Sequence, residues 1–204
     1  MRVQVNEIGK ILNESKERLV IIGQPKGVGL TTSLIEFFTE KLFFEENFSV
    51  FLLVDNIRTK SEIANMLEEF LYSAYEYNTK FNYSNNVIKV YNNILAIISY
   101  TDSDLAIIED VNSNFKFQYG VIEKDDDNEM LNYYLTEYLP NICNRIIVAT
   151  YDKEDSIFYM VEDENVLKLI VFSELSKKNI QMLNRMSDYT LDFEKITKGY
   201  FNHD

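Results

Sequence analysis

Short apolar segments recur along the chain and predict the strands of a sheet. Each has four to six residues, most of them apolar, and polar residues flank it. Strands that are buried on both faces read as nearly continuous apolar runs, so these segments favour a sheet that is covered on both sides. We expect strands at residues 18–22, 50–54, 105–108, 145–150, 167–172 and 189–193.

Between these segments, apolar residues recur every three or four positions and predict helices. Thr59 and Glu62 form a capping-box pattern that would start the helix near residues 63–75. We expect helices near residues 31–46, 63–75, 87–98, 130–139 and 178–186. Alternating strands and helices are typical of an α/β fold with a mostly parallel sheet and helices on both faces. Because there is no linker or repeat, we expect one domain spanning residues 1–204.

The turn after the first predicted strand carries the clearest chemical signal. Three of the six glycines of the chain fall between Gly23 and Gly29, and the turn leads into a helix that opens with Thr31 and Thr32. A strand, a glycine-rich turn and a helix present successive backbone N–H groups to a phosphate. We therefore expect a phosphate loop made of Gly23, Lys26, Gly27, Val28, Gly29, Leu30, Thr31 and Thr32. The Thr31 hydroxyl stands where such a loop would hold Mg²⁺.

This loop departs from the usual pattern in two ways. Leu30 stands where a lysine normally precedes the hydroxyl residue, and Gly23 is one residue too far from Gly29. A leucine cannot contact the β- and γ-phosphates, where a cation is a main source of catalysis. Three interpretations stay open: a tight turn that binds no nucleotide, nucleotide binding with weak or no hydrolysis, and an ATPase that uses Lys26 or a cation from a partner.

Two further polar sites follow predicted strands. Glu109 and Asp110 end the strand at 105–108, as the acidic residues of a Walker B segment would, and they are the candidate catalytic residues. Glu109 with Thr31 would then be the ligands of Mg²⁺. Thr150 and Asp152 follow the next predicted strand, at a place where sensor residues lie in such folds. The alternative in each case is a strand end with no chemical role.

Charge and composition exclude several classes of function. The net charge of -13 argues against direct binding of nucleic acid, which usually needs a basic face. With one cysteine, and with His203 as the only histidine, neither a thiolate metal site nor a histidine-based catalytic triad is expected. Residues 123–129 are strongly acidic and are interpreted as a solvated loop leading into a helix, with a cation site or an acidic docking tail as the alternative. No membrane span or signal peptide is predicted, so we expect the protein in the cytoplasm, or the nucleus of a eukaryote.

The chain resembles the RecA/KaiC/DnaB-like group of P-loop proteins. Besides the loop, the segment 50–54 with its following helix is similar to their second strand-helix unit, and residues 104–112 are similar to their Walker B strand. Residues 186–200 resemble the closing strands of that group. Some members keep the fold but lose the ATPase motifs. The resemblance implies a single RecA-like domain with a degenerate loop, and ATP with Mg²⁺ as the cofactor if the site is retained.

A second resemblance is to the ParA/MinD group. Residues 26–32 echo its loop, with Lys26 as the signature lysine, and Asp55 resembles the acid after its second strand. The segment after Asp55 departs from that pattern. The RecA-like resemblance is favoured, and it implies a non-catalytic or weakly catalytic subunit that acts as an assembly partner, for example a recombination, replication or Elongator-type accessory factor. The alternative is a nucleotide-dependent switch using Lys26. A protein partner or a second copy is expected, with nucleic acid reached only through a partner.

Overall fold

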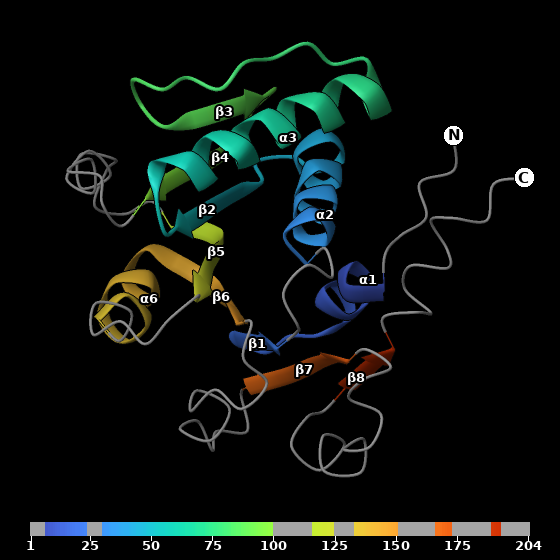
Figure 1. Cartoon of the computed structure of the whole chain (residues 1–204), viewed down its shortest axis with the longest axis vertical. Helices are drawn as coiled ribbons and strands as arrows, with labels where there is room; N and C mark the ends of the chain where they lie inside the picture. Colours follow the sequence, from blue (N-terminus) through green and yellow to red (C-terminus); the bar gives the residue numbers. More distant parts are fainter. Residues whose placement is uncertain are drawn as a thin grey trace, which may run out of the picture.

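In the part of the chain that the computed structural model describes, eight strands form one sheet in the order β3-β4-β2-β5-β6-β1-β7-β8 (Figure 1). The structure describes residues 7–23, 30–99, 116–124, 133–150, 166–172 and 189–192. Neighbouring strands are parallel except for the antiparallel pair β3 and β4, which confirms the expected mostly parallel sheet. The strands are β1 (Leu19–Gly23), β2 (Ser49–Val54), β3 (Val87–Val90), β4 (Asn93–Ser99), β5 (Phe117–Lys124), β6 (Cys143–Thr150), β7 (Val166–Phe172) and β8 (Tyr189–Asp192).

Helices cover both faces of the sheet, as the apolar strands require. The helices are α1 (Glu7–Glu14), α2 (Leu30–Phe44), α3 (Ile57–Tyr75), the π-helix η1 (Tyr134–Tyr138) and α6 (Leu139–Ile142). Alternate residues of β2 separate the two cores: Val50 and Leu52 pack in the core beneath α1, α2 and α3, while Phe51 and Leu53 pack in the core beneath η1 and α6. Figure 1 shows α1 and α2 on one side of the strands and α6 on the other. Among the described residues, no helix combines the length and apolarity needed to cross a bilayer.

The predicted helix at 87–98 is wrong, because this segment forms the hairpin of β3 and β4. Tyr91 adopts a left-handed conformation with φ 55 at the turn between them. The segment is rich in valine and isoleucine, which favour strands, and β4 completes its hydrogen bonds by pairing in parallel with β2. The apolar spacing that suggested a helix arises where two short strands meet at a two-residue turn.

Strand β5 was not predicted, although it lies in the middle of the sheet between β2 and β6. Its half-buried residues Gln118 and Tyr119 interrupt the apolar run that marks the other central strands. The loop expected from residue 123 is also wrong at its start, because Glu123 and Lys124 belong to β5. The predicted strand at 105–108 and helix at 178–186 lie outside the described residues.

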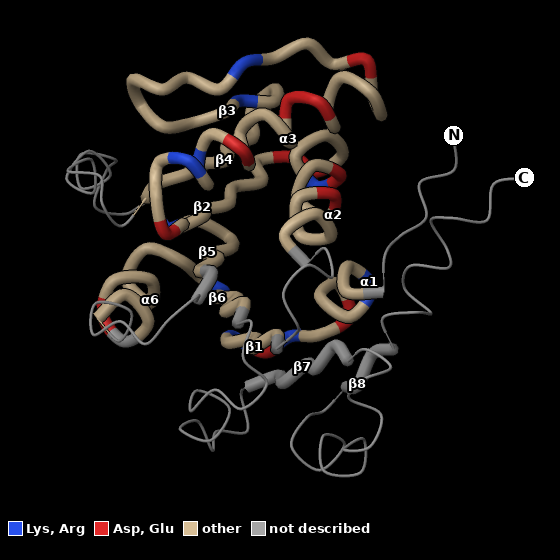
Figure 2. Tube along the Cα trace, in the orientation of Figure 1, with Lys and Arg blue, Asp and Glu red and all other residues tan. Residues whose placement is uncertain are grey.

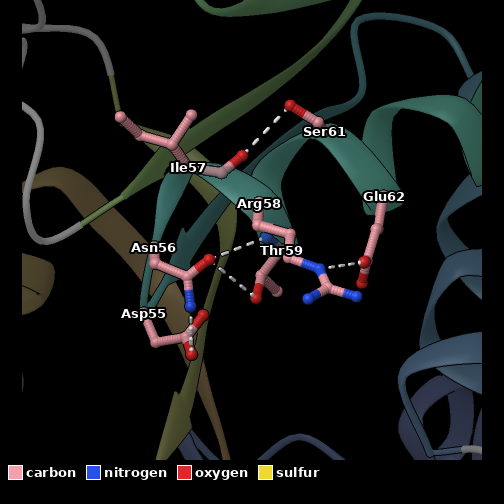
Figure 3. A network of polar contacts seen from close by, with 7 residues as sticks. All are labelled: Asp55, Asn56, Ile57, Arg58, Thr59, Ser61 and Glu62. Carbon is pink, nitrogen blue, oxygen red and sulfur yellow. Dashed lines mark hydrogen bonds and ion pairs between the residues drawn. The ribbon is translucent and has the colours of Figure 1, made fainter.

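Helix α3 begins at a different cap from the predicted one (Figure 3). Asn56 is the N-cap, and its Oδ1 accepts a hydrogen bond of 3.0 Å from the backbone N–H of Thr59. Glu62 forms an ion pair with Arg58 at 2.8 Å instead of closing a capping box. Asparagine caps a helix as well as threonine does, so the earlier cap prevails. The helix ends at Glu76, whose left-handed φ of 53 is the usual geometry of a C-cap.

A buried asparagine ties the end of α2 to the hairpin. Asn93 Nδ2 donates hydrogen bonds to the carbonyls of Leu42 and Glu45, at 2.7 Å and 2.6 Å. Asn93 Oδ1 accepts a bond of 2.6 Å from the backbone N–H of Phe48. The side chain thereby satisfies carbonyls that the helix end leaves unpaired, and it fixes the turn between α2 and β2.

Candidate nucleotide site

The parallel strands bring several predicted site residues to one edge of the sheet. Gly23 at the end of β1 is paired in register with Thr150 at the end of β6, and Thr150 is paired with Lys124 at the end of β5. Glu123 is paired with Ala149 in the row before. Ligands of open α/β sheets bind outside the carboxyl ends of the strands, where the strand order reverses. Such a reversal lies at β1, because the chain crosses first to β2 on one side and later to β7 on the other.

The helix that follows β1 starts as predicted. β1 ends at Gly23, and α2 begins at Leu30, so Thr31 and Thr32 lie in the first turn of the helix and are half-buried. This turn contains no acidic residue. The first N–H groups of an α-helix have no partner within the helix, and the positive end of the helix dipole favours an anion there. The side chain of Leu30 and the loop residues Lys26, Gly27, Val28 and Gly29 lie outside what the structure describes.

A small apolar recess places Thr31 beside the ends of two strands. Thr31, Val54 of β2, Ile63 of α3 and Val121 of β5 line it together. Its volume is about 20 Å³, roughly the room that one water molecule needs. The recess is thus too small for a ligand. The shared lining shows that the start of α2 lies next to the carboxyl ends of β2 and β5, near Asp55 and Glu123 in the sequence.

Asp55 has an unusual environment at this edge. Its Oδ2 accepts a hydrogen bond of 2.7 Å from Asn56 Nδ2, as Figure 3 shows. Its Oδ1 is buried and has no hydrogen-bond partner in the described part of the chain. A buried polar atom without a partner costs free energy, and such atoms commonly mark a place for a ligand or a bound water. Asp55 therefore offers an acceptor directly after Val54, which lines the recess together with Thr31.

The donors at this edge fit Mg²⁺ in type but not as a complete cage. Within the described ranges, no group of three or more His, Cys, Asp or Glu side chains could hold a metal ion. Mg²⁺ does not require such a group, since it is usually bound through one or two carboxylates, substrate phosphates and water. Asp55 supplies a carboxylate, and Thr31 supplies a hydroxyl oxygen. The predicted ligand Glu109 and its neighbour Asp110 lie outside the described residues, as does Asp152.

Sequence reasoning missed Glu123. The apolar pair Val121 and Ile122 directly precedes this acid at the end of β5, which is the same strand-then-acid pattern that pointed to Glu109. β5 pairs with both β2 and β6, so its acid stands at the edge that also holds Gly23 and Thr150. The signal was present in the sequence but was assigned to an acidic loop.

Comparisons with known proteins give likeness in structure only. No family model matches the chain, and no curated protein matches it in sequence. The ATPase domain of a Thermus phage large terminase is similar, with a TM-score of 0.59 and 7% identity, over 86% of this chain and 84% of that domain. The Phi-28 gp11 DNA packaging motor has a TM-score of 0.52 and 15% identity, over 88% of this chain and 66% of the motor.

A large terminase of a thermophilic bacteriophage, solved in complex with ATP-gamma-S, has a TM-score of 0.52 and 13% identity. The match covers 84% of this chain and 45% of the terminase. The chain thus spans two thirds or less of these two longer proteins and most of the isolated ATPase domain. At such low identities the likeness concerns the fold. The chain shares its α/β fold with these proteins.

Proposed function

We propose that this chain is a nucleotide-binding P-loop domain with weak or no ATP hydrolysis, and that it works as one subunit of a protein complex. The observation that supports the proposal is that Thr31, in the first turn of α2, lies beside Val54 of β2 and Val121 of β5, two strands whose carboxyl ends carry the acids Asp55 and Glu123. The fold of phage ATPase domains supports a nucleotide as the ligand.

The roles of the residues follow from their chemistry. The N–H groups of the first turn of α2 would hold phosphate oxygens, since no acid in that turn repels them. The Thr31 hydroxyl and a carboxylate, Asp55 or Glu123, would hold Mg²⁺, which supplies charge to orient and neutralise the phosphates when it is bound. Leu30 provides no cation at the β- and γ-phosphates, so the transition state for hydrolysis would lack one of its main stabilising charges.

Binding of a fluorescent ATP analogue, with and without Mg²⁺, tests the proposal. We expect saturable binding that depends on Mg²⁺ and that weakens by about 10-fold or more in Thr31→Val, because the hydroxyl contacts a charged group. Thr79→Val is the matched control, since Thr79 bonds only the carbonyl of Lys89 on β3 in the described structure. If millimolar nucleotide does not bind to the full chain, the site is only a strand-to-helix turn.

The acid that holds the metal can be identified in the same assay. Glu123→Gln and Glu109→Gln each remove one negative charge from an acid that follows apolar residues. From the strand order, which places β5 between β2 and β6, we expect Glu123→Gln to reduce the effect of Mg²⁺. A reduced effect of Mg²⁺ in Glu109→Gln, and none in Glu123→Gln, would instead support the Walker B segment predicted from the sequence.

A second candidate is an ATP-driven motor or switch, favoured by the likeness to packaging ATPases. In this case Lys26 would supply the cation that Leu30 cannot, as in the ParA/MinD-like alternative. Steady-state phosphate release distinguishes the two candidates. Turnover that is abolished by Lys26→Ala, with or without DNA, would establish the active enzyme. Nucleotide binding without turnover, together with a stable oligomer or a captured partner in size-exclusion chromatography, would establish the assembly subunit.

A further inference from the structure

A second surface, at the opposite end of α2 from Thr31, gathers five aromatic side chains, of which two are largely exposed and three are partly buried. The aromatic patch consists of Phe43 and Phe44 at the end of α2, Tyr75 at the end of α3, Tyr77, and Tyr91 at the β3–β4 turn. Phe44 is 66% exposed and Tyr91 is 64% exposed. Side chains of this size are rarely so exposed when they only stabilise a core, and clusters of them often mark binding sites.

The rings of the aromatic patch contact one another in a fixed arrangement. Phe43 stacks on Tyr75 with 4.3 Å between the ring centroids and 9° between the planes, and it lies 5.7 Å from Tyr91. Phe44 meets Tyr75 edge to face at 5.4 Å. The backbone N–H of Tyr91 donates a hydrogen bond of 3.3 Å to Tyr77 Oη. Because the rings support each other, the exposed faces lose little freedom when a partner binds.

The electrostatic environment of the patch is negative. Burial, and then the negative charges of Glu40 and Glu36, raise the pKa of the Tyr75 phenol above its ordinary value. Two lysines of this region are already engaged, Lys41 with Glu45 and Lys80 with Glu68. Figure 2 shows the acidic residues along α2 and in the C-terminal half of α3.

We propose that the aromatic patch binds an arginine-rich segment of another protein. Guanidinium groups stack on exposed aromatic rings and pair with carboxylates, and Glu40 supplies one, since it lies four residues before Phe44 on the same side of α2. Nucleic acid and anionic membranes carry the same sign of charge as this face and would be repelled. A second copy of the chain would bring its own acidic side chains, and its net charge of -13, against the first.

Fluorescence anisotropy with labelled octa-arginine as the probe tests this proposal at 0.15 M salt, where long-range attraction is screened. The full chain is compared with a double variant, Phe44→Ser with Tyr91→Asn, which keeps the net charge. Asparagine tolerates the left-handed backbone of position 91. Tyr133→Ser is the matched control, because Tyr133 is also exposed but precedes η1, on the opposite face of the sheet. Thermal unfolding verifies that each variant is folded.

We expect the double variant to bind octa-arginine about tenfold more weakly, and Tyr133→Ser to bind it like the unaltered chain. Octa-lysine should bind the unaltered chain more weakly than octa-arginine, because lysine stacks less well on rings. Equal affinity of the double variant and the unaltered chain would show that charge alone attracts the probe, and would overturn the proposal. So would a dimer in sedimentation that the double variant dissociates, or tighter binding of an oligonucleotide that depends on the patch.

Discussion

Alanine at position 120 would introduce a methyl group where α6 and β6 leave no room for one. A Cβ at Gly120 would lie 2.6 Å from Cys143 Sγ, 3.1 Å from Cys143 Cβ and 3.4 Å from a methyl group of Leu139. Cys143 is buried and belongs to the core beneath α6, so its sulfur has little space to move away. We therefore expect Gly120→Ala to destabilise the fold through overpacking of a well-filled core.

The magnitude follows from two opposing effects. Overpacking of this kind costs about 1–3 kcal/mol. Alanine also reduces the freedom of the unfolded chain, which stabilises by about 0.4–1 kcal/mol. We expect a net loss of about 1–2 kcal/mol in the free energy of unfolding, since the first effect exceeds the second. Urea denaturation followed by far-UV circular dichroism measures this loss as a lower midpoint with an unchanged slope.

A double-mutant cycle with Cys143→Ala tests the stated cause. Removing the sulfur costs about 1 kcal/mol by itself, since a buried group the size of a methylene is lost. It also removes the contact of 2.6 Å that the new methyl group would make. In the Cys143→Ala background, Gly120→Ala should therefore cost at least about 1 kcal/mol less than in the natural sequence. The same cost in both backgrounds would refute the explanation, because the strain would then lie elsewhere in β5.

The remaining predictions concern caps and a buried thiol. Asn93→Ala should cost about 2–4 kcal/mol, measured by urea denaturation, because it leaves two carbonyls of α2 and the amide of Phe48 without their partner. Glu76→Gly should increase the free energy of unfolding by about 0.4–1 kcal/mol, seen as a higher thermal midpoint, because glycine adopts the left-handed C-cap of α3 without strain. Glu69→Gly inside α3 should instead decrease the free energy of unfolding by about 1 kcal/mol. Burial raises the pKa of Cys143 from 9.0 to about 12. The stability that this thiol contributes is therefore complete below pH 9 and decreases by about 1.4 kcal/mol per unit as the pH rises toward 12, and Cys143→Ala should remove this component.

The parts of the fold that could be predicted from the sequence are those where local pattern and tertiary context agree. β1, β2 and β6 are buried on both faces, so their apolar runs identify them directly. β5 and the β3–β4 hairpin could not be recognised in the same way. In β5, half-buried polar residues interrupt the pattern, and in the hairpin the pairing of β4 with β2 overrides a spacing that resembles a helix.

The candidate site was predictable to a similar extent. The turn after β1 identified the start of α2 with Thr31, because glycines between an apolar strand and a helix have few other uses. The strand order decides which acid lies beside Thr31, and no local segment of the sequence reveals that order. Glu123 reaches the edge because β5 inserts between β2 and β6. Asp55 Oδ1 stands out because it is buried without a hydrogen-bond partner in the described structure, and the sequence does not show which atoms are buried.

The position of β1 in the sheet has a consequence for synthesis on the ribosome. Both neighbours of β1, namely β6 and β7, come more than one hundred residues later in the chain, since Leu19 pairs with Ile146 and Val166. At ordinary translation rates, the nascent chain would carry an unpaired apolar strand for on the order of ten seconds. Throughout this interval β1 is exposed to chaperones and to other nascent chains. We therefore expect co-translational misfolding to begin at β1.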